Sequence, residues 1–329
     1  MSEVLLLFEP DIRSIVGPEE AFGGVRDAFA GLARGEAILP DVINLDIPSS
    51  GAEAHVKGAH LRGSPFFSVK VASGSHDNPS RGVPVGSGIV LVFDATTGFP
   101  RAVLFDNGYL TEIRTGAAGA IAADLLAKRD VERVDVVGVG AQARYQIAAL
   151  LRVRTPERAI AYGRSEVKAT AYAREIADHH GVTVLPAKTV EQAVRGSDIV
   201  VTVTPSREPL VRADWVLPGT HITAVGSDGP QKQELDVGVL RKADKVVADR
   251  LDQCARLGEI HHAIEVGAMR REDVYAELGE IAAGTKAGRE RDDEITVADL
   301  TGVGVQDAAV ANVVVDAALR RGMGQVLDV

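Results

Sequence analysis

The segment that decides the fold is Val134-Asp135-Val136-Val137-Gly138-Val139-Gly140-Ala141-Gln142-Ala143. The apolar run at its start predicts a buried strand, and the residues that follow the glycines predict a helix. Gly138 permits a tight turn, Gly140 lets the backbone approach a pyrophosphate, and Ala143 lets the helix pack on the strand. Phosphates would bind the amides at the helix N-terminus, where unpaired donors and the helix dipole favour negative charge. We therefore predict a dinucleotide site at this turn, with contacts from Gly138, Gly140, Ala141 and Gln142.

From Glu132 onward the sequence alternates between strand and helix patterns. Helices are expected at 165–179 and 189–195, and strands at 134–139, 158–162, 182–185, 199–204, 221–225 and 245–248. This alternation is typical of a parallel sheet covered on both faces, and it predicts an α/β fold with a Rossmann domain. Residues 284–294 are rich in glycine and charge and have no period, so we expect a solvated loop there.

The first third of the chain has a different pattern. Residues 87–93 and 100–105 flank a turn-forming segment and predict a β-hairpin. Further strands are expected at 3–8, 41–48, 55–61 and 66–71, and helices at 18–32 and 115–128. This part is therefore a sheet of antiparallel character with helices. A last helix at 308–321 is expected to return to it, since no further strand is expected after that helix.

Composition excludes several classes of protein. The chain has 329 residues, 46% apolar and 25% charged, which is typical of a globular protein with two domains. A net charge of −10 argues against nucleic-acid and anionic-membrane partners. No apolar stretch approaches the ~18–20 residues of a membrane helix, and the start lacks the basic segment of a signal peptide. The single cysteine, Cys254, suits a reducing cytoplasm and indicates a buried thiol rather than a catalytic one.

The residues alone favour NADP slightly, with NAD as the alternative. NAD sites usually place an acid at the end of the second strand, but this strand ends in Ala161-Tyr162-Gly163-Arg164-Ser165. Arg164 and Ser165 could contact the 2′-phosphate of NADP, whereas Arg164 could also stack on the adenine of NAD. We further assign Thr204 and Thr115 as cofactor contacts.

Four motifs follow one another in a specific order. Phe67-Ser68-Val69-Lys70 and Asp77-Asn78-Pro79 come first, and Thr111-Glu112-Ile113-Arg114-Thr115-Gly116-Ala117-Ala118 precedes the glycine turn. The segment Gly226-Ser227-Asp228-Gly229-Pro230-Gln231-Lys232-Gln233-Glu234-Leu235 follows that turn. This combination resembles the ornithine cyclodeaminase/μ-crystallin family over nearly the whole chain.

The resemblance implies a Rossmann domain at 118–305, inserted into an α+β substrate-binding and dimerisation domain at 1–117 and 306–329. The family is usually homodimeric and includes cyclodeaminases, alanine dehydrogenases, cyclic ketimine reductases and reductases of imino diacids. It implies that Lys70 and Arg114 receive the substrate carboxylate, and that Asp228 handles protons at the substrate nitrogen. From the residues alone, Asp228 could instead cap a helix.

The chain departs from the cyclodeaminase pattern in two places. Cyclodeaminases carry a glutamate thirteen residues before the active lysine, where this chain has Lys57, and an arginine in the segment that matches 39–45, where it has none. A lysine would repel the second ammonium of ornithine and attract a second carboxylate. The alternative is an insertion that leaves Lys57 on the surface.

Two further segments resemble one branch of the family. Residues 106–111, and 258–263 with Gln253-Cys254, are similar to the ectoine-utilisation homologues and iminosuccinate reductases, which act on C4 imino or amino dicarboxylates. Because iminosuccinate reductases use NADH, this similarity favours NAD, with NADP as the alternative. His261 and His262 have no recognisable metal-ligand spacing, so structural roles and no metal are expected.

We therefore expect an NAD(P)H-dependent imine reductase that converts a small α-imino acid, iminosuccinate above all, to the L-amino acid, L-aspartate. Lys70, Arg114 and Asp228 are the expected catalytic residues, and Lys57 joins Lys70 and Arg114 in binding substrate. The alternatives are an ornithine cyclodeaminase forming proline and ammonia, an alanine-type dehydrogenase, and a non-catalytic NADPH-binding protein like μ-crystallin. A cytoplasmic homodimer is expected.

Overall fold

The computed structural model describes residues 3–75 and 77–328. The chain forms two compact units, which we call the split unit (Met1–Arg114 with Val303–Val329) and the inserted unit (Thr115–Gly302). The divisions fall after Arg114 and Gly302, where the sequence had suggested residues 117 and 305. Among the described residues, no helix combines the length and apolar character needed to cross a membrane.

The split unit is built on one eight-stranded sheet. The strands follow the order β16-β1-β7-β6-β5-β4-β2, and β3 pairs with β4 beside this path. Of the pairings between these described strands, β1 with β7 is parallel and the others are antiparallel, as the sequence predicts. The strands are β1 (Glu3–Phe8), β2 (Ala37–Ile38), β3 (Ile43–Ile47), β4 (Ala52–Leu61), β5 (Phe66–Ser75), β6 (Gly86–Asp94), β7 (Pro100–Phe105) and β16 (Gln325–Asp328).

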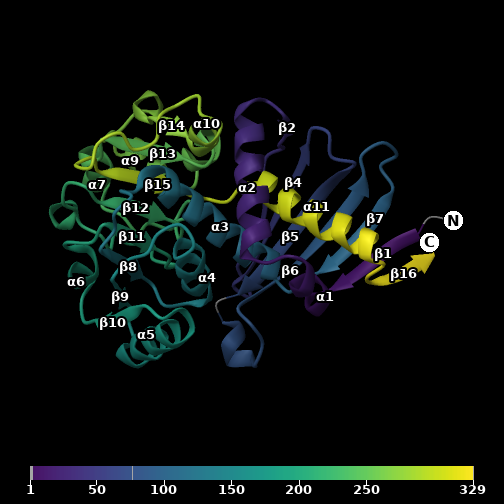
Figure 1. The fold of residues 1–329 in the computed structure, drawn as a ribbon, viewed down its shortest axis with the longest axis horizontal. Coiled ribbons are helices and arrows are strands. Elements are labelled where there is room, and N and C mark those ends of the chain that lie inside the picture. The colour runs from purple at the N-terminus through teal and green to yellow at the C-terminus, as the bar shows by residue number, and fades with distance from the viewer. Residues whose placement is uncertain (1–2, 76, 329) are drawn as a thin grey trace. The chain divides into compact units, whose positions relative to one another are not determined.

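Helices cover one face of this sheet. α2 (Pro18–Ala33) and α11 (Gly304–Arg321) pack on each other, and α11 crosses β4 and β5 (Figure 1). The short helices α1 (Glu9–Ile15) and η1 (Asn78–Arg81) complete the unit. Alternate side chains of a strand point to opposite faces. The positions of β5 and β6 on the covered face, Lys70 and Val90 among them, are accordingly buried, while their neighbours on the other face are only partly buried.

The structure adds a strand that the sequence did not indicate and begins two helices earlier than expected. β16 follows α11 and pairs with β1, so the expectation of no further strand is wrong. α11 begins at Gly304 rather than at residue 308, because Gln306 closes its first turn by accepting a hydrogen bond from the Val303 amide. α3 (Tyr109–Leu126) begins at Tyr109 rather than at Thr115, because the Asp106 carboxylate accepts the Leu110 amide at its start.

The inserted unit has an eight-stranded parallel sheet with the order β10-β9-β8-β11-β12-β15-β13-β14. The first five strands reproduce the 3-2-1-4-5 order of a Rossmann sheet, and the predicted α/β fold is confirmed. Its strands are β8 (Arg133–Val137), β9 (Arg158–Tyr162), β10 (Thr183–Ala187), β11 (Ile199–Thr202), β12 (His221–Ala224), β13 (Lys245–Ala248), β14 (Ala276–Glu277) and β15 (Thr296–Asp299). β15 was missed in the sequence, although it lies inside the sheet between β12 and β13.

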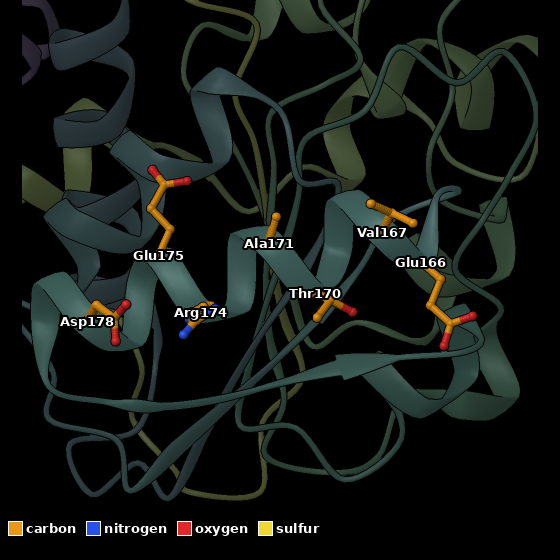
Figure 2. Close-up of a pocket in the computed structure, with 7 residues that line it drawn as sticks. All are labelled: Glu166, Val167, Thr170, Ala171, Arg174, Glu175 and Asp178. Carbon is orange, nitrogen blue, oxygen red and sulfur yellow. The ribbon is translucent and has the colours of Figure 1, made fainter.

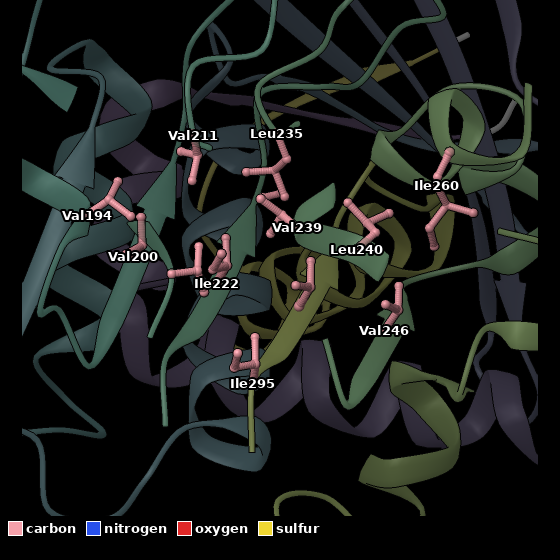
Figure 3. Close-up of a cluster of buried hydrophobic side chains, with 14 of the residues drawn as sticks. Val194, Val200, Val211, Ile222, Leu235, Val239, Leu240, Val246, Ile260 and Ile295 are labelled. Carbon is pink, nitrogen blue, oxygen red and sulfur yellow. The ribbon is translucent and has the colours of Figure 1, made fainter. Parts of the chain in front are cut away.

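Helices follow most of these strands and bury a core against them. They are α4 (Ala141–Leu150), α5 (Glu166–His180), α6 (Val190–Val194), α7 (Val237–Lys242), α8 (Leu251–Cys254), α9 (Glu259–Glu265) and α10 (Leu278–Ala282), with short 3-10 turns η2 (Ala213–Trp215) and η3 (Arg271–Asp273). α5 presents an outer face of mostly polar side chains (Figure 2). Away from α5, side chains of α7 and α9 pack against the sheet residues Val200, Ile222 and Val246 (Figure 3).

The loop at 284–294 contains no helix or strand, as expected, but it is not simply solvated. Arg289 is partly buried and donates hydrogen bonds to the carbonyl oxygens of Leu126 (2.7 Å) and Glu294 (2.6 Å). A cation is favourable at the carboxyl end of a helix. Arg289 therefore stabilises the end of α3, and this part of the charge run has a structural role.

Candidate active site

The split unit places Lys70 in a buried position on β5. Only 2% of this residue is exposed, and its neighbours across the sheet are Lys57 on β4 and Val90 on β6. Directly opposed residues in antiparallel strands lie on the same face. Lys70 and Lys57 therefore both lie on the face that α11 covers.

Asp307, in the first turn of α11, joins the two predicted substrate cations. Its Oδ1 atom accepts hydrogen bonds from Lys70 Nζ and from Arg114 Nε, each at 3.0 Å. Arg114 also donates from Nη1 to Gln306 Oε1 at 2.7 Å. Arg114, Gln306 and Asp307 are each 5% exposed or less. The structure thus brings together Lys70 and Arg114, and adds two residues that the sequence analysis missed.

Two polar atoms of this cluster have no hydrogen-bond partner within the described chain. They are Asp307 Oδ2, an acceptor, and Gln306 Nε2, a donor. A buried polar group without a partner costs about 1–3 kcal/mol, so native proteins usually satisfy such groups. A bound ligand that carries both an N–H donor and a carboxylate acceptor, as α-amino and α-imino acids do, would satisfy both atoms.

Burial dominates the protonation of this cluster. It lowers the pKa of Lys70 to about 7, although the Asp307 carboxylate acts in the opposite direction. The charges of Arg114 and Lys57 lower that pKa further. Burial alone would raise the pKa of Asp307, but the three cations hold it below its ordinary value. Asp307 is therefore ionised at neutral pH, and Lys70 can exchange its proton in that range.

Lys57 is half-buried on β4, and its charge acts on both Lys70 and Asp307. It does not occupy the exposed surface position that an insertion would have given it. Asp106 also supports the cluster, since its buried carboxylate caps α3, the helix that carries Arg114.

The glycine turn of the inserted unit has the shape that a pyrophosphate requires. Gly138 has φ +117°, and a Cβ atom there would lie 2.6 Å from the carbonyl oxygen of Val203. Gly140 precedes α4, and a Cβ atom there would meet nothing within 4 Å. Open space thus lies beside the first amides of α4, with Ala141 exposed at its start. The residues present fit a dinucleotide phosphate at this turn.

Hydrogen bonds fix the surroundings of this turn. Arg144 donates to the carbonyl oxygens of Val139 and Gly140 while it pairs with Glu175. Gln146 donates to Gln142 Oε1 (3.1 Å) and to the Thr115 carbonyl (2.9 Å). Two predicted cofactor contacts, Gln142 and Thr115, are therefore linked through a glutamine that the sequence analysis did not single out.

The other predicted cofactor residues lie at the ends of neighbouring strands. Arg164 is exposed after β9, and the Ser165 hydroxyl accepts the Lys168 amide, so Ser165 caps α5. Thr204 follows β11, and its amide donates to the buried Glu234 carboxylate at 2.5 Å. The carboxyl ends of parallel strands are where ligands bind in sheets of this kind.

Asp228 lies in the loop after β12 and is half-exposed. Its carboxylate pairs with Lys232 Nζ at 2.7 Å, and both residues have further interactions. It does not cap a helix, because α7 begins later and its N-cap is Asp236. The alternative role that the residues had left open for Asp228 is therefore wrong.

Cys254 and the His261–His262 pair, which the sequence also singled out, lie outside the Lys70–Arg114 cluster. Cys254 is fully buried, and burial raises the pKa of its thiol well above the ordinary value, which does not suit a nucleophile. His261 and His262 do have an acidic neighbour, since Glu265 brings three potential ligand atoms within 4.8 Å of one another. This spacing on α9 differs from the expectation that the two histidines have no metal-ligand partner at a recognisable spacing. However, Nε2 of His262 contacts the Lys232 carbonyl oxygen at 2.8 Å.

A hollow also lies along the outer face of α5. Its lining comes from one helix, and the Glu166, Glu175 and Asp178 side chains point in different directions (Figure 2). Glu175 is also engaged by Arg144. The hollow lacks convergent polar groups, so we do not place the active site there.

The fold defines an oxidoreductase with a Rossmann unit inserted into an α+β unit. The chain belongs to the ornithine cyclodeaminase/mu-crystallin family, whose model matches residues 11–322. The resemblance noted in the motifs is therefore confirmed. Members similar to this chain are dehydrogenases and reductases that act on imine or amino-acid groups.

Three relatives illustrate the range of the family. A protein from Sinorhizobium fredii, named an uncharacterized cyclodeaminase, is 41% identical and covers 100% of both chains. An archaeal alanine dehydrogenase dimer with bound NAD superimposes with a TM-score of 0.93 at 39% identity, over 99% of both chains. The iminosuccinate reductase of Paracoccus denitrificans, in complex with NAD+, gives a TM-score of 0.91 at 30% identity, over 100% of both chains.

Proposed function

We propose that the protein is an NADH-dependent imine reductase that converts a small α-imino acid, iminosuccinate above all, to the L-amino acid, L-aspartate. The observation that carries this proposal is the buried cluster of Lys70, Arg114, Gln306 and Asp307. It contains two cations against one carboxylate, and its unpaired donor and acceptor atoms match the carboxylate and nitrogen of an imino acid.

Arg114 and Lys70 attract the α-carboxylate, and Gln306 Nε2 donates a hydrogen bond to it. Asp307 Oδ2 accepts the N–H of the substrate. Binding of this carboxylate raises the pKa of Lys70, because a negative charge favours the protonated amine. A protonated Lys70 therefore accumulates when substrate is bound. These contacts orient the C=N bond before the reaction begins, so no free energy is spent on ordering the substrate during the chemical step.

Reduction of the C=N bond requires a hydride on carbon and a proton on nitrogen. Bound NADH supplies the hydride, and the glycine turn with Gly138 and Gly140 is assigned to its pyrophosphate. Lys70 or Asp228 supplies the proton, which leaves the donor as a neutral amine or a carboxylate. The product is an amino acid, which releases more easily once Lys70 has lost its charge.

Lys57 is assigned to the second carboxylate of the substrate. It faces the same side of the sheet as Lys70, and its positive charge acts on the cluster. A dicarboxylate such as iminosuccinate gains from this charge, whereas the second ammonium of ornithine would be repelled.

NADH is favoured over NADPH. NAD is the nucleotide in both the archaeal alanine dehydrogenase and the iminosuccinate reductase structures. Ser165, one of the two residues that could contact a 2′-phosphate, already serves as the cap of α5.

A second candidate is reductive amination of pyruvate to alanine. The observation in its favour is the 39% identity to the archaeal alanine dehydrogenase over nearly the whole chain. The imine of pyruvate has one carboxylate, which the Lys70–Arg114 cluster can hold without Lys57.

The test is oxidation of NADH and of NADPH at 340 nm, with oxaloacetate and ammonia at alkaline pH, followed by a chiral assay for aspartate. Faster oxidation of NADH with formation of L-aspartate would support the proposal. Pyruvate in place of oxaloacetate tests the second candidate in the same cuvette. Ammonia released from ornithine, with no net change in absorbance and no reductase activity, would contradict both and indicate a cyclodeaminase.

The protein is also proposed to be a homodimer that forms through the sheet face without helices. This face is apolar: Ile43 and Leu45 of β3 are 64% and 57% exposed, and partly buried apolar residues of the central strands continue it. These further residues are Val56, Val69, Val71, Ile89, Leu91 and Val103. Exposed apolar patches of this extent mark interaction surfaces, and the alanine dehydrogenase of the same fold is a dimer.

A further inference from the structure

Glu234 belongs to a motif of the sequence to which no role has yet been assigned. It lies in the inserted unit, after the Asp228 loop, and is 0% exposed. Its carboxylate bridges two backbone segments: Oε1 accepts the Thr204 amide at 2.5 Å, and Oε2 accepts the Gly226 amide at 2.8 Å. Thr204 follows β11 and Gly226 follows β12. One side chain therefore fixes the ends of two adjacent strands.

The two segments approach so closely that only glycine fits at 226. A Cβ atom there would lie 2.2 Å from the Thr204 carbonyl oxygen and 2.6 Å from Oε2 of Glu234. The loop that follows is closed by the Lys232 carbonyl, which accepts from the Ser227 hydroxyl and contacts His262. The loop carries Asp228, so the position of that carboxylate depends on how these contacts hold the backbone.

A second buried acid holds Glu234 in turn. Glu259, at the start of α9, accepts the amides of Glu234 (2.8 Å) and Leu235 (3.1 Å). Among the described residues, no ion pair of Glu234 or Glu259 is found, so hydrogen bonds compensate for their burial: backbone amides for both, and the side chain of Thr204 for Glu234. Burial raises the pKa of Glu234 to about 7 and that of Glu259 well above its ordinary value. Burying two carboxyl groups costs free energy. Native structures retain such hydrogen-bonded networks where the position of a backbone segment has to be fixed.

The two fixed segments lie at one end of the dinucleotide site. In a Rossmann sheet, the glycine turn after the first strand holds the pyrophosphate, and the end of the second strand contacts the adenosine ribose. Here these are the turn after β8 and the Arg164 segment after β9. β11 and β12 lie on the opposite side of β8 from β9, which is the side left for the nicotinamide.

We propose that Glu234 is a positioning residue for the nicotinamide half of the cofactor and for Asp228. It acts by fixing the Thr204 and Gly226 backbone at the ends of β11 and β12, and it contacts neither the adenosine half nor the pyrophosphate. The proposal rests on the proposed use of a nicotinamide cofactor, but it can be tested by binding alone.

The test compares the affinities of NADH and ADP-ribose, which lacks the nicotinamide, for the wild type and for Glu234→Gln. The amide keeps the shape of the side chain but turns one acceptor into a donor, so it faces one of the two backbone N–H groups. That hydrogen bond lies within the protein, so its loss weakens NADH binding only through the displaced backbone, and a tenfold loss of affinity corresponds to about 1.4 kcal/mol. NADH is expected to bind Glu234→Gln about tenfold more weakly, while the affinity for ADP-ribose stays at the wild-type value.

Glu234→Asp provides the second variant, since the shorter carboxylate keeps its charge but cannot reach both amides. It is expected to show the same selective loss of NADH affinity. Glu272→Gln, an exposed glutamate of the inserted unit, is the matched control and should bind both ligands as the wild type does. Circular dichroism and thermal melting monitor folding of each variant.

Equal loss of NADH and ADP-ribose affinity in both variants would show that Glu234 only maintains the fold, and the proposal would be wrong. Unchanged affinity for NADH would also overturn it. If the wild type reduces no imine but binds NADH, the proposed reaction fails while this comparison keeps its meaning. In an active enzyme, kcat should fall in both variants, because Asp228 moves with the Gly226 segment.

Discussion

Lys57 lies directly opposite Lys70 in the antiparallel register of β4 and β5, on the sheet face that α11 covers. Two lysines at facing positions of a sheet repel each other. The pair is tolerated because Asp307 lies close enough for both charges to act on it. The arrangement concentrates positive charge where an anionic substrate is expected.

Replacing Lys57 by glutamate should abolish the preference for a dicarboxylate. The kcat/KM for oxaloacetate with ammonia is expected to fall by about a hundredfold, which corresponds to the loss of an ionic hydrogen bond and the gain of a repulsion. The value for pyruvate with ammonia should change far less. Lys57→Met, which removes the charge and keeps an apolar stem, is the control and should show an intermediate loss. Full activity of Lys57→Glu on oxaloacetate would disprove the assignment.

Asp307→Asn should destabilise the protein strongly. The change leaves Lys70 and Arg114 buried side by side without their shared carboxylate, and breaking a buried ion pair typically costs about 3–5 kcal/mol. The free energy of unfolding, measured by denaturant titration, is expected to fall by this amount. Asp316→Asn on the exposed side of the same helix removes a surface pair with Arg320 and should cost about 1 kcal/mol or less. Similar values for the two variants would contradict the role given to Asp307.

Binding of a carboxylate ligand should depend on pH through Lys70. Burial lowers the pKa of this lysine to about 7, so its positive charge is present below that pH and lost above it. Since the ligand favours the charged form, the affinity for succinate should decrease as pH rises through 7, by up to about tenfold per pH unit. Titration calorimetry at several pH values measures this slope.

Lys70→Arg supplies the control for this pH dependence. Arginine keeps its charge throughout the range, so the slope should disappear even if the affinity itself changes. A slope that persists in this variant would assign the titration to another group.

The two glycines of the turn should respond differently to alanine. Gly138→Ala places a side chain at φ +117° and against the Val203 carbonyl, so stability should fall by more than about 1 kcal/mol. Gly140→Ala meets open space in the free protein and should melt as the wild type does, but NADH should bind at least about tenfold more weakly because the methyl group occupies the phosphate position. Wild-type NADH affinity in Gly140→Ala would place the pyrophosphate elsewhere.

Leu45→Lys should convert the proposed dimer to a monomer. The substitution puts a charge in the apolar sheet face without disturbing a buried side chain, because Leu45 is 57% exposed. Light scattering after size-exclusion chromatography gives the molar mass. Val167→Lys, at an apolar position on α5 that is 79% exposed, is the control and should keep the mass of the wild type. A dimer that survives Leu45→Lys would show that another surface forms it.

Local patterns explain which parts of the molecule could be predicted. The glycine turn, the Rossmann alternation and the β6–β7 hairpin depend on neighbouring residues, and the sequence indicates them directly. Lys70 and Arg114 were found through family motifs. Asp307 was missed because its helix was expected to start at residue 308, just after it, and because its contact with Lys70 joins positions 237 residues apart. No local pattern reports such a contact.

Glu234 and β15 are two further features that could not be predicted from the sequence. Glu234 stands in a quoted motif, but a glutamate at the end of a polar run gives no sign that it will be buried against backbone amides. β15 follows a polar loop and has polar residues at both ends, Thr296 and Asp299, so it lacks the apolar run that indicated β13. Its place in the middle of the sheet depends on pairing with β12 and β13, far away in the sequence.

The completion of the split unit by α11 and β16 has a consequence for synthesis. Residues 115–302 form a continuous unit that can fold as soon as it leaves the ribosome, since domains generally fold as they emerge. The first 114 residues cannot do the same, because the acid that neutralises Lys70 and Arg114, and the strand that pairs with β1, are translated almost last. Only at the end of synthesis, once residue 302 has been added, does the nascent chain therefore hold a complete inserted unit beside a split unit that still lacks its last helix and strand.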